Sequence, residues 1–241
     1  MNILVMKFGG TSVANIEKLK NVSSIIKKEI NNYKIVVVLS AIAGATNDLQ
    51  KYIDKVDSLN SADSDLVITS GEQVSVGLLS ILLNKSKIKS LPLLGWQIPI
   101  ITDSSYGKAK ILNIESEVLL EHLKKYDVIV VAGFQGISTE GKISSLGRGG
   151  SDTTAVALAS ALKAERCDIY TDVDGVYSTD PNMDSSAKKI DKIAYEEMLE
   201  MSSMGAKVLQ TRSVELAMKN NLTLQVISSI NKIKGTMIVN E

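Results

Sequence analysis

The sequence has few of the side chains that metal centres and disulfide frameworks need. Its 241 residues include one cysteine, Cys167, and one histidine, His122. A single cysteine excludes an internal disulfide and a thiolate metal cluster, and a single histidine excludes a site with several histidine ligands. We therefore expect a protein of the reducing cytoplasm, in which Cys167 is a small packing residue and His122 lies on a polar, surface helix.

An excess of charge of one sign and long apolar runs are also missing. Lysine and arginine number 27 together, as do aspartate and glutamate, and no basic cluster is longer than a pair. Nucleic acid and membranes are therefore not expected as partners, whereas small molecules are. The apolar segment before Lys7 is too short for a signal peptide, and we expect no run of membrane-spanning length.

The most informative stretch that is present combines glycines with charged and hydroxyl side chains. Residues 147–150 contain three glycines, and an apolar, small-residue helix is predicted over 155–162. Glycines allow a close backbone approach, and the free N–H groups of a helix start favour an anion. Arg148 adds a planar fork for a carboxylate or phosphate, and residues 151–153 add two hydroxyls and a carboxylate. The alternative is a plain glycine turn with a helix cap.

Three known ligand motifs nearly match this sequence and fail. Residues 147–152 begin like a dinucleotide fingerprint, but Asp152 stands where the third glycine is required. Residues 136–142 have P-loop spacing, but Ile143 replaces the hydroxyl residue that would hold magnesium. Residues 172–183 are similar to a calcium-binding loop, but they lack its glycine and its closing glutamate.

Several predicted strands end in small or polar residues. A strand over 2–8 ends beside Lys7 and is followed by two glycines, which indicates either a second anion site or a plain turn into a helix. Further buried strands are predicted over 33–39 and 127–132. Glu72 is the only charge between residues 66 and 83, so it either has a partner or is a solvated carboxylate at a helix start.

Strands that alternate with helices predict an α/β protein. We expect a three-layer α/β/α sandwich with a mainly parallel central sheet and with ligands at the carboxyl edge of its strands. The whole chain, 1–241, would be one domain in two closely joined lobes. The lobe of about residues 1–130 would bind the acceptor, and the lobe of about residues 131–241 would bind a nucleotide.

Four ordered motifs together resemble the aspartate kinases of the amino acid kinase family. They are Lys-Phe-Gly-Gly-Thr-Ser at 7–12, Gly-Phe-Gln-Gly at 133–136, Gly-Arg-Gly-Gly-Ser-Asp-Thr-Thr at 147–154 and the run 171–181. The resemblance covers nearly the whole chain. It implies the ATP- and magnesium-dependent phosphorylation of L-aspartate to 4-phospho-L-aspartate, the first step toward lysine and diaminopimelate, threonine and methionine.

The resemblance also implies a role for individual residues. Lys7 and Asp152 would be catalytic, and magnesium would be carried by ATP without a direct side-chain ligand. The ATP site would comprise Lys7, Phe8, Gly9, Gly10, Thr171, Asp172, Tyr177, Asp180, Lys207 and Val208. The L-aspartate site would comprise Ser40, Thr46, Glu72, Arg148 and Ser151.

The sequence departs from the family pattern at two points. Asn182 stands where the family often has arginine, and the family's pair of regulatory ACT domains is not expected, so the chain alone should not respond to lysine or threonine. A homodimer is expected, and a separate regulatory chain remains an alternative. Alternative functions are those of a uridylate, glutamate or acetylglutamate kinase and of a non-catalytic nucleotide-binding subunit. Arg148 with Glu72 favours an amino-acid acceptor, and intact Lys7 and Asp152 favour catalysis.

Overall fold

The computed structural model of the chain describes all residues except 57–59, 182, 185, 206–207, 232–233 and 241. Its centre is an eight-stranded sheet in the order β12-β14-β13-β9-β1-β2-β6-β3. The six strands from β3 to β13 are parallel, while β14 runs antiparallel to β13 and parallel to β12. The strands are β1 (Ile3–Phe8), β2 (Lys34–Leu39), β3 (Ser90–Leu93), β6 (Val128–Ala132), β9 (Arg166–Thr171), β12 (Lys192–Ala194), β13 (Leu224–Ser228) and β14 (Thr236–Val239).

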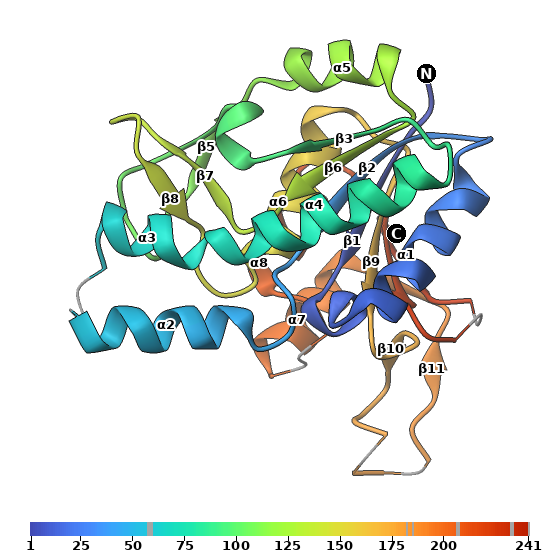
Figure 1. Cartoon of the computed structure of the whole chain (residues 1–241). Coiled ribbons are helices and arrows are strands. Elements are labelled where there is room, and N and C mark those ends of the chain that lie inside the picture. Colours follow the sequence, from blue (N-terminus) through green and yellow to red (C-terminus); the bar gives the residue numbers. More distant parts are fainter. Residues whose placement is uncertain (57–59, 182, 185, 206–207, 232–233, 241) are drawn as a thin grey trace.

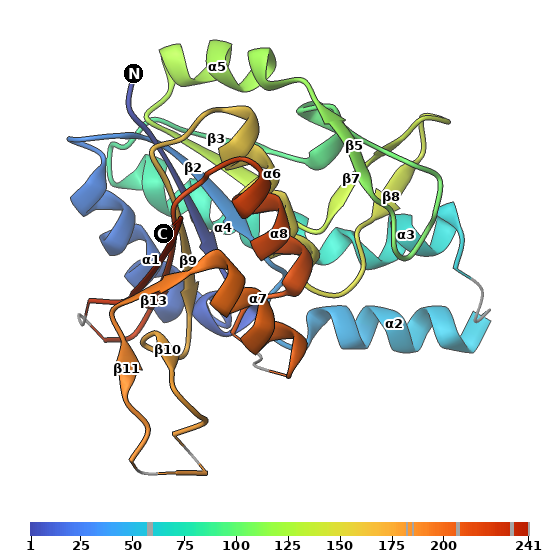
Figure 2. The ribbon, with the colours of Figure 1, turned by 180° about the vertical axis from the view of Figure 1, so that it is seen from behind.

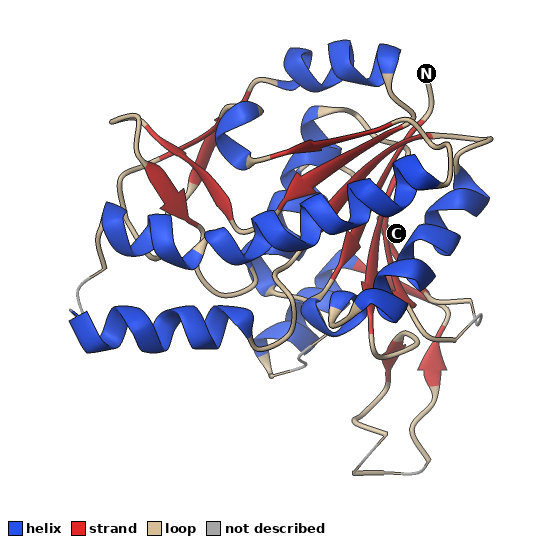
Figure 3. Cartoon of the chain, in the orientation of Figure 1, coloured by secondary structure: helices blue, strands red, loops and turns tan. Residues whose placement is uncertain are grey.

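Helices cover both faces of this sheet (Figures 1, 2 and 3). One face packs against α1 (Ile16–Glu29) and α4 (Ser70–Lys85). The other packs against α5 (Ser116–Lys125), α6 (Gly150–Ala161), α7 (Tyr195–Ser203) and α8 (Thr211–Lys219). The central strands are apolar on both faces for this reason, and β6 is buried along its whole length. The predicted three-layer sandwich with a mainly parallel sheet is confirmed.

A smaller sheet extends the fold beside the carboxyl edge of the main one. It has four strands in the order β5-β4-β7-β8, and α3 (Ala62–Ile68) packs against β8. The strands are β4 (Ile100–Thr102), β5 (Ile111–Ile114), β7 (Gln135–Ser138) and β8 (Ile143–Ser145). The remaining elements are α2 (Ala45–Val56), the short helices η1 (Gly10–Val13) and η2 (Gly95–Gln97), and the paired strands β10 (Val176–Tyr177) and β11 (Lys189–Ile190). The paired strands β10 and β11 extend from the body of the fold (Figures 1 and 2).

Long buried elements agree with the sequence, whereas most strands of the smaller sheet were not predicted. The strands predicted over 2–8, 33–39 and 127–132 agree with β1, β2 and β6 to within one residue at either end. Cys167 is fully buried in the core, as predicted, and His122 lies on α5. Of the smaller sheet, the sequence predicts one strand, over 99–102, which agrees with β4 (Ile100–Thr102). The main sheet takes strands from both predicted lobes, because β1 pairs with both β2 and β9.

One expectation about apolar runs is wrong. The helical run Ala62–Lys85, which joins α3 to α4, is long and apolar enough to cross a membrane by length and composition. Core helices of globular proteins also meet this description, and α4 packs Val76, Leu79 and Leu83 against the central sheet. Its hydrophobicity therefore has a structural cause within the fold.

Candidate active site

Lys7 and Asp152 form an ion pair at the carboxyl edge of the main sheet. Lys7 lies near the end of β1, in the middle of the sheet, and Asp152 lies in the first turn of α6. Their charged atoms are 2.5 Å apart, and each side chain is 12% exposed. The pair is thus largely shielded from solvent, but both residues line a cavity.

The start of α6 has the geometry of an anion-binding site. Gly149 caps the helix with φ of 67° and makes no side-chain cap, so the N–H groups of the first turn lack a side-chain acceptor from the cap. Glycine is required here, since a Cβ at this φ would be strained and would also collide with Gln210. The predicted loop feeding a helix is confirmed.

Arg212, which the sequence did not single out, holds this glycine loop from the other side. It lies on α8, and its Nη2 donates hydrogen bonds to the carbonyl oxygens of Gly147 and Arg148. Burial lowers the pKa of Arg212, and the nearby Asp152 carboxylate opposes that shift. No local pattern marked this arginine, because its partners are more than 60 residues away in sequence.

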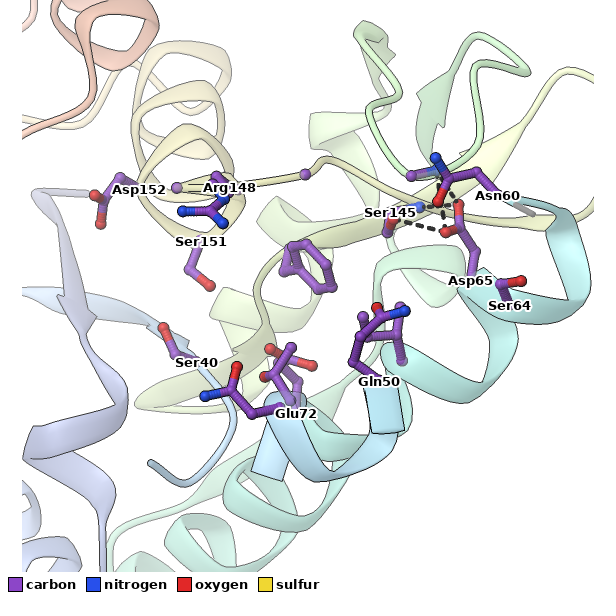
Figure 4. Close-up of a pocket in the computed structure, with 18 of the residues that line it drawn as sticks. Ser40, Gln50, Asn60, Ser64, Asp65, Glu72, Ser145, Arg148, Ser151 and Asp152 are labelled. Carbon is purple, nitrogen blue, oxygen red and sulfur yellow. Dashed lines mark hydrogen bonds between the residues drawn. The ribbon is translucent and has the colours of Figure 1, made fainter. Parts of the chain in front are cut away.

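A cavity of about 560 Å³ opens beside the ion pair. All five residues predicted to contact the acceptor line it together with Lys7 and Asp152. These five are Ser40, Thr46, Glu72, Arg148 and Ser151. Figure 4 labels Asp152 and four of the five, all except Thr46. The cavity continues toward a polar end at Asn60, Ser64 and Asp65, which the sequence did not predict.

Glu72 is a buried carboxylate with unused hydrogen-bonding capacity. It is 3% exposed, and its Oε1 accepts a hydrogen bond of 3.1 Å from the backbone N–H of Ala41. Its Oε2 accepts no hydrogen bond within the described part of the chain. Burial raises the pKa of Glu72 to about 7, and the Ala41 N–H partly offsets this. A carboxylate in this position is suited to receive a cationic group of a ligand.

The residues predicted to contact ATP follow the ends of β1 and β9. Gly9 donates a backbone hydrogen bond to Tyr170, which brings the glycine turn after β1 next to Thr171. Phe8 is fully buried and stacks on Tyr170 with ring centroids 4.4 Å apart, so its side chain supports this edge from within the core. Thr171 donates to Asp172, and Tyr177 donates to Asp174.

The remaining predicted nucleotide residues are more scattered. Asp180 lies in the exposed loop after β10, and Val208 packs against the main core before α8. Lys207 and Asn182 lie outside the described residues.

Two serines that the sequence did not identify join the ends of three strands. The hydroxyl of Ser12, in η1, donates to the hydroxyl of Ser229 over 2.8 Å. Ser229 follows β13 and donates to the carbonyl of Thr171. Hydrogen bonds therefore connect the glycine turn and the end of β9 to the end of β13.

Within the described ranges, no three or more histidine, cysteine, aspartate or glutamate side chains gather as a metal site would require. Asp152 is the carboxylate nearest to the helix start that could receive phosphate groups. A divalent cation that enters with a triphosphate would be held mainly by phosphate oxygens.

Comparison with known proteins agrees with this geometry. An aspartate kinase of Pseudomonas fluorescens is 49% identical over 99% of this chain, and the chain spans 59% of that relative's length. The structure of E. coli aspartokinase III in complex with aspartate and ADP matches with a TM-score of 0.88 and 29% identity, over 100% of this chain and 65% of that one. Uridylate kinase from Archaeoglobus fulgidus shares the fold, with a TM-score of 0.68 and 21% identity over 99% of this chain and 100% of that one.

A model of the amino acid kinase family matches residues 2–228, which include every strand from β1 to β13 and the whole cavity. The chain belongs to the amino acid kinase family.

Proposed function

We propose that this chain transfers a phosphoryl group from ATP to the side-chain carboxylate of L-aspartate, giving 4-phospho-L-aspartate and ADP. One observation carries the proposal: Glu72 and Arg148, which are opposite in charge, line the same cavity beside Lys7 and Asp152. An amino acid presents both an ammonium and a carboxylate, so it can pair with both groups at once. The aspartate and ADP bound to E. coli aspartokinase III support the same two substrates.

The acceptor would be held at both of its backbone charges. Oε2 of Glu72, which has no hydrogen bond from the described residues, would accept from the ammonium. The exposed guanidinium of Arg148 would grip the α-carboxylate with two parallel hydrogen bonds. The hydroxyls of Ser40, Thr46 and Ser151 line the same cavity and would orient the side-chain carboxylate. This arrangement favours an amino acid over a nucleotide such as UMP.

The chemistry requires positioning and charge but no general base. A side-chain carboxylate is already ionised near neutral pH, so it can attack the γ-phosphorus without losing a proton. Lys7 and the N–H groups at the start of α6 would stabilise the negative charge on the transferring phosphoryl group. Asp152 would hold the Lys7 ammonium in place through their ion pair.

Magnesium would enter with ATP and would neutralise charge on its phosphates, with Asp152 the nearest carboxylate. The nucleotide would lie over Gly9 and Gly10 and extend toward Thr171, Asp172, Tyr177, Asp180, Lys207 and Val208. In this arrangement the acceptor is held mainly by residues of about 1–130 and the nucleotide mainly by residues of about 131–241.

The setting of the reaction follows from its chemistry. An acyl phosphate hydrolyses readily, so an enzyme that consumes the product must be present in the same compartment, which we propose is the cytoplasm. The product would feed the synthesis of lysine or diaminopimelate, threonine and methionine. We further propose that the chain forms a homodimer. A separate regulatory chain could supply feedback control in place of regulatory ACT domains.

The test is ADP release with L-aspartate, L-glutamate or UMP as the acceptor, combined with hydroxylamine trapping. We expect magnesium-dependent turnover with L-aspartate and a hydroxamate product, because hydroxylamine converts an acyl phosphate to a hydroxamate. Turnover with UMP but not with aspartate would instead assign the chain to a nucleotide acceptor. ATP binding without turnover on any acceptor would favour a non-catalytic subunit.

A further inference from the structure

Asp65 is a buried carboxylate to which the proposed chemistry gives no role. It lies on α3, is 2% exposed and lines the far part of the cavity. Its oxygens accept hydrogen bonds from the N–H of Ser145 at 2.6 Å, the hydroxyl of Ser145 at 2.7 Å and the N–H of Gly107 at 3.1 Å (Figure 4). All of these donors are neutral, and no cation forms an ion pair with Asp65 among the described residues.

Burying a carboxyl group is an expensive way to join a helix to a strand. An apolar contact would do so without the cost of removing a polar group from water. The carboxylate instead provides direction, because each hydrogen bond restricts both a distance and an angle. Asp65 is therefore suited to fixing a position.

A second hydrogen bond acts in parallel with those of Asp65. The side-chain amide of Gln135, which is 1% exposed, donates to the carbonyl of Thr69 over 3.0 Å. Gln135 and Ser145 lie directly opposite each other on β7 and β8. Asp65 and Thr69 are four residues apart, one turn along the same helical run. The cross-strand pair of Gln135 and Ser145 thus forms hydrogen bonds to two successive turns of the helix.

These hydrogen bonds join two segments of the chain, and each segment leads directly to a charged residue of the cavity. Thr69 immediately precedes α4, whose first turn carries Glu72. Ser145 ends β8, and Arg148 follows three positions later. The hydrogen bonds of Asp65 and Gln135 therefore connect the backbone segment that carries Glu72 to the backbone segment that carries Arg148.

We propose that Asp65 is a positioning residue that fixes the spacing between Glu72 and Arg148, and so the spacing between the two charges of the amino acid that the cavity accepts. The inference rests on the proposed function for the identity of that ligand. Asp65 itself does not touch the acceptor. It acts through Ser145 and the loop that follows, and its removal should weaken acceptor binding more than nucleotide binding.

The variant Asp65→Ala removes both acceptor oxygens, and Asp65→Asn is the conservative comparison. Asparagine keeps one carbonyl for the N–H groups, and its amide can donate to the Ser145 hydroxyl, which can turn to accept. A matched control is Asp168→Ala, because Asp168 is also 2% exposed but pairs with Arg166 and does not line the cavity. Water can enter at Asp65 from the cavity and satisfy the freed N–H groups, but it cannot restore their position.

We expect Asp65→Ala to raise KM for L-aspartate by about tenfold to a hundredfold, because a displacement on the order of 1 Å has effects of that size. KM for ATP should change less than about threefold, and Asp65→Asn should recover most of the loss, because it keeps most of the hydrogen bonds. Asp168→Ala should lower the melting temperature without separating the two KM values. If Asp65→Ala raised both KM values in the same proportion, or neither, Asp65 would be only a structural residue and the proposal would be overturned.

Hydrogen exchange tests whether Asp65 fixes the position of the segment after β8, without any assumption about the substrate. In the unliganded protein, Asp65→Ala should speed exchange at the amides of residues 145–149 but not in β1 or β9. If the wild-type protein fails to phosphorylate aspartate, the proposed function falls while this measurement still decides the role of Asp65. If Asp65→Ala does not fold, Ser145→Ala removes one of the same hydrogen bonds and should give the same local change to a smaller degree. Unchanged exchange at these amides would overturn the proposal.

Discussion

The buried environment of Glu72 predicts a contribution of this residue to stability that falls as the pH rises toward neutrality. The pKa of Glu72 is raised from 4.5 to about 7, chiefly because burial disfavours the charged form. Between these two values the folded state binds a proton that the unfolded state has released. Stability from this group is therefore greatest below about pH 4.5, declines as the pH rises, and levels off above about pH 7.

The size of the effect follows from the pKa difference, at about 1.4 kcal/mol for each pKa unit. From 4.5 to about 7 this amounts to about 3 kcal/mol, a substantial part of the stability of an ordinary domain. Glu72→Gln removes the titration and keeps a carbonyl oxygen for the N–H of Ala41. The variant should therefore be more stable than the wild type at pH 8 by up to about 3 kcal/mol, and close to it at pH 5.

Urea unfolding of the unliganded protein between pH 5 and pH 8.5 measures this difference directly. Glu17→Gln is the control, because it makes the same chemical change at a side chain that is 79% exposed. A Glu72→Gln difference that is flat with pH, or that grows toward low pH, would show that Glu72 titrates normally and would refute the reasoning.

The same substitution should impair binding while it stabilises the fold. At pH 8 an ammonium ligand would lose its ionised partner, so KM for L-aspartate should rise by at least about tenfold. In the wild type, KM for L-aspartate should rise as the pH falls below about 7, because a proton then competes with the ammonium for Glu72. Equal aspartate affinity in both proteins at pH 8 would exclude Glu72 from the acceptor site.

Three further substitutions separate the roles of the charged groups. Lys7→Ala should lower kcat by about two to three orders of magnitude and change aspartate affinity far less, because it removes the positive charge that we propose stabilises the transferring phosphoryl group. Steady-state kinetics that showed a change in KM alone would contradict this role. Arg148→Lys should mainly raise KM for L-aspartate, because a point charge cannot reproduce a two-pronged contact, and an unchanged KM would remove Arg148 from the acceptor site. Arg212→Ala removes the hydrogen bonds to two carbonyl groups of the glycine loop. It should raise KM for L-aspartate by about tenfold, which is the effect of losing one hydrogen bond to a charged group. Unaltered kinetics would show that the loop keeps its conformation without Arg212.

The sequence by itself determined the parts of this protein that depend on local patterns. A buried parallel strand has a continuous apolar run, so β1, β2 and β6 could be predicted to within one residue at either end. Glycines beside Lys7 and Arg148 marked the turns predicted to bind ligands, because close backbone approach requires them. The family resemblance then supplied the residues predicted to contact the acceptor, which the structure brings together in one cavity.

Only the tertiary structure decided the interactions between segments far apart in the sequence. Asp65 resembles any acidic residue in a first helical turn, and its partner Ser145 is 80 residues away. Arg212 has the same character, since nothing near it in the chain shows that it meets the glycine loop. The short strands β5, β7 and β8 carry too few residues for a periodic signal, and their pairing partners hold them in place. The tertiary fold also decided that one oxygen of Glu72 is left without a hydrogen bond from the described residues, because burial is a property of everything packed around a residue.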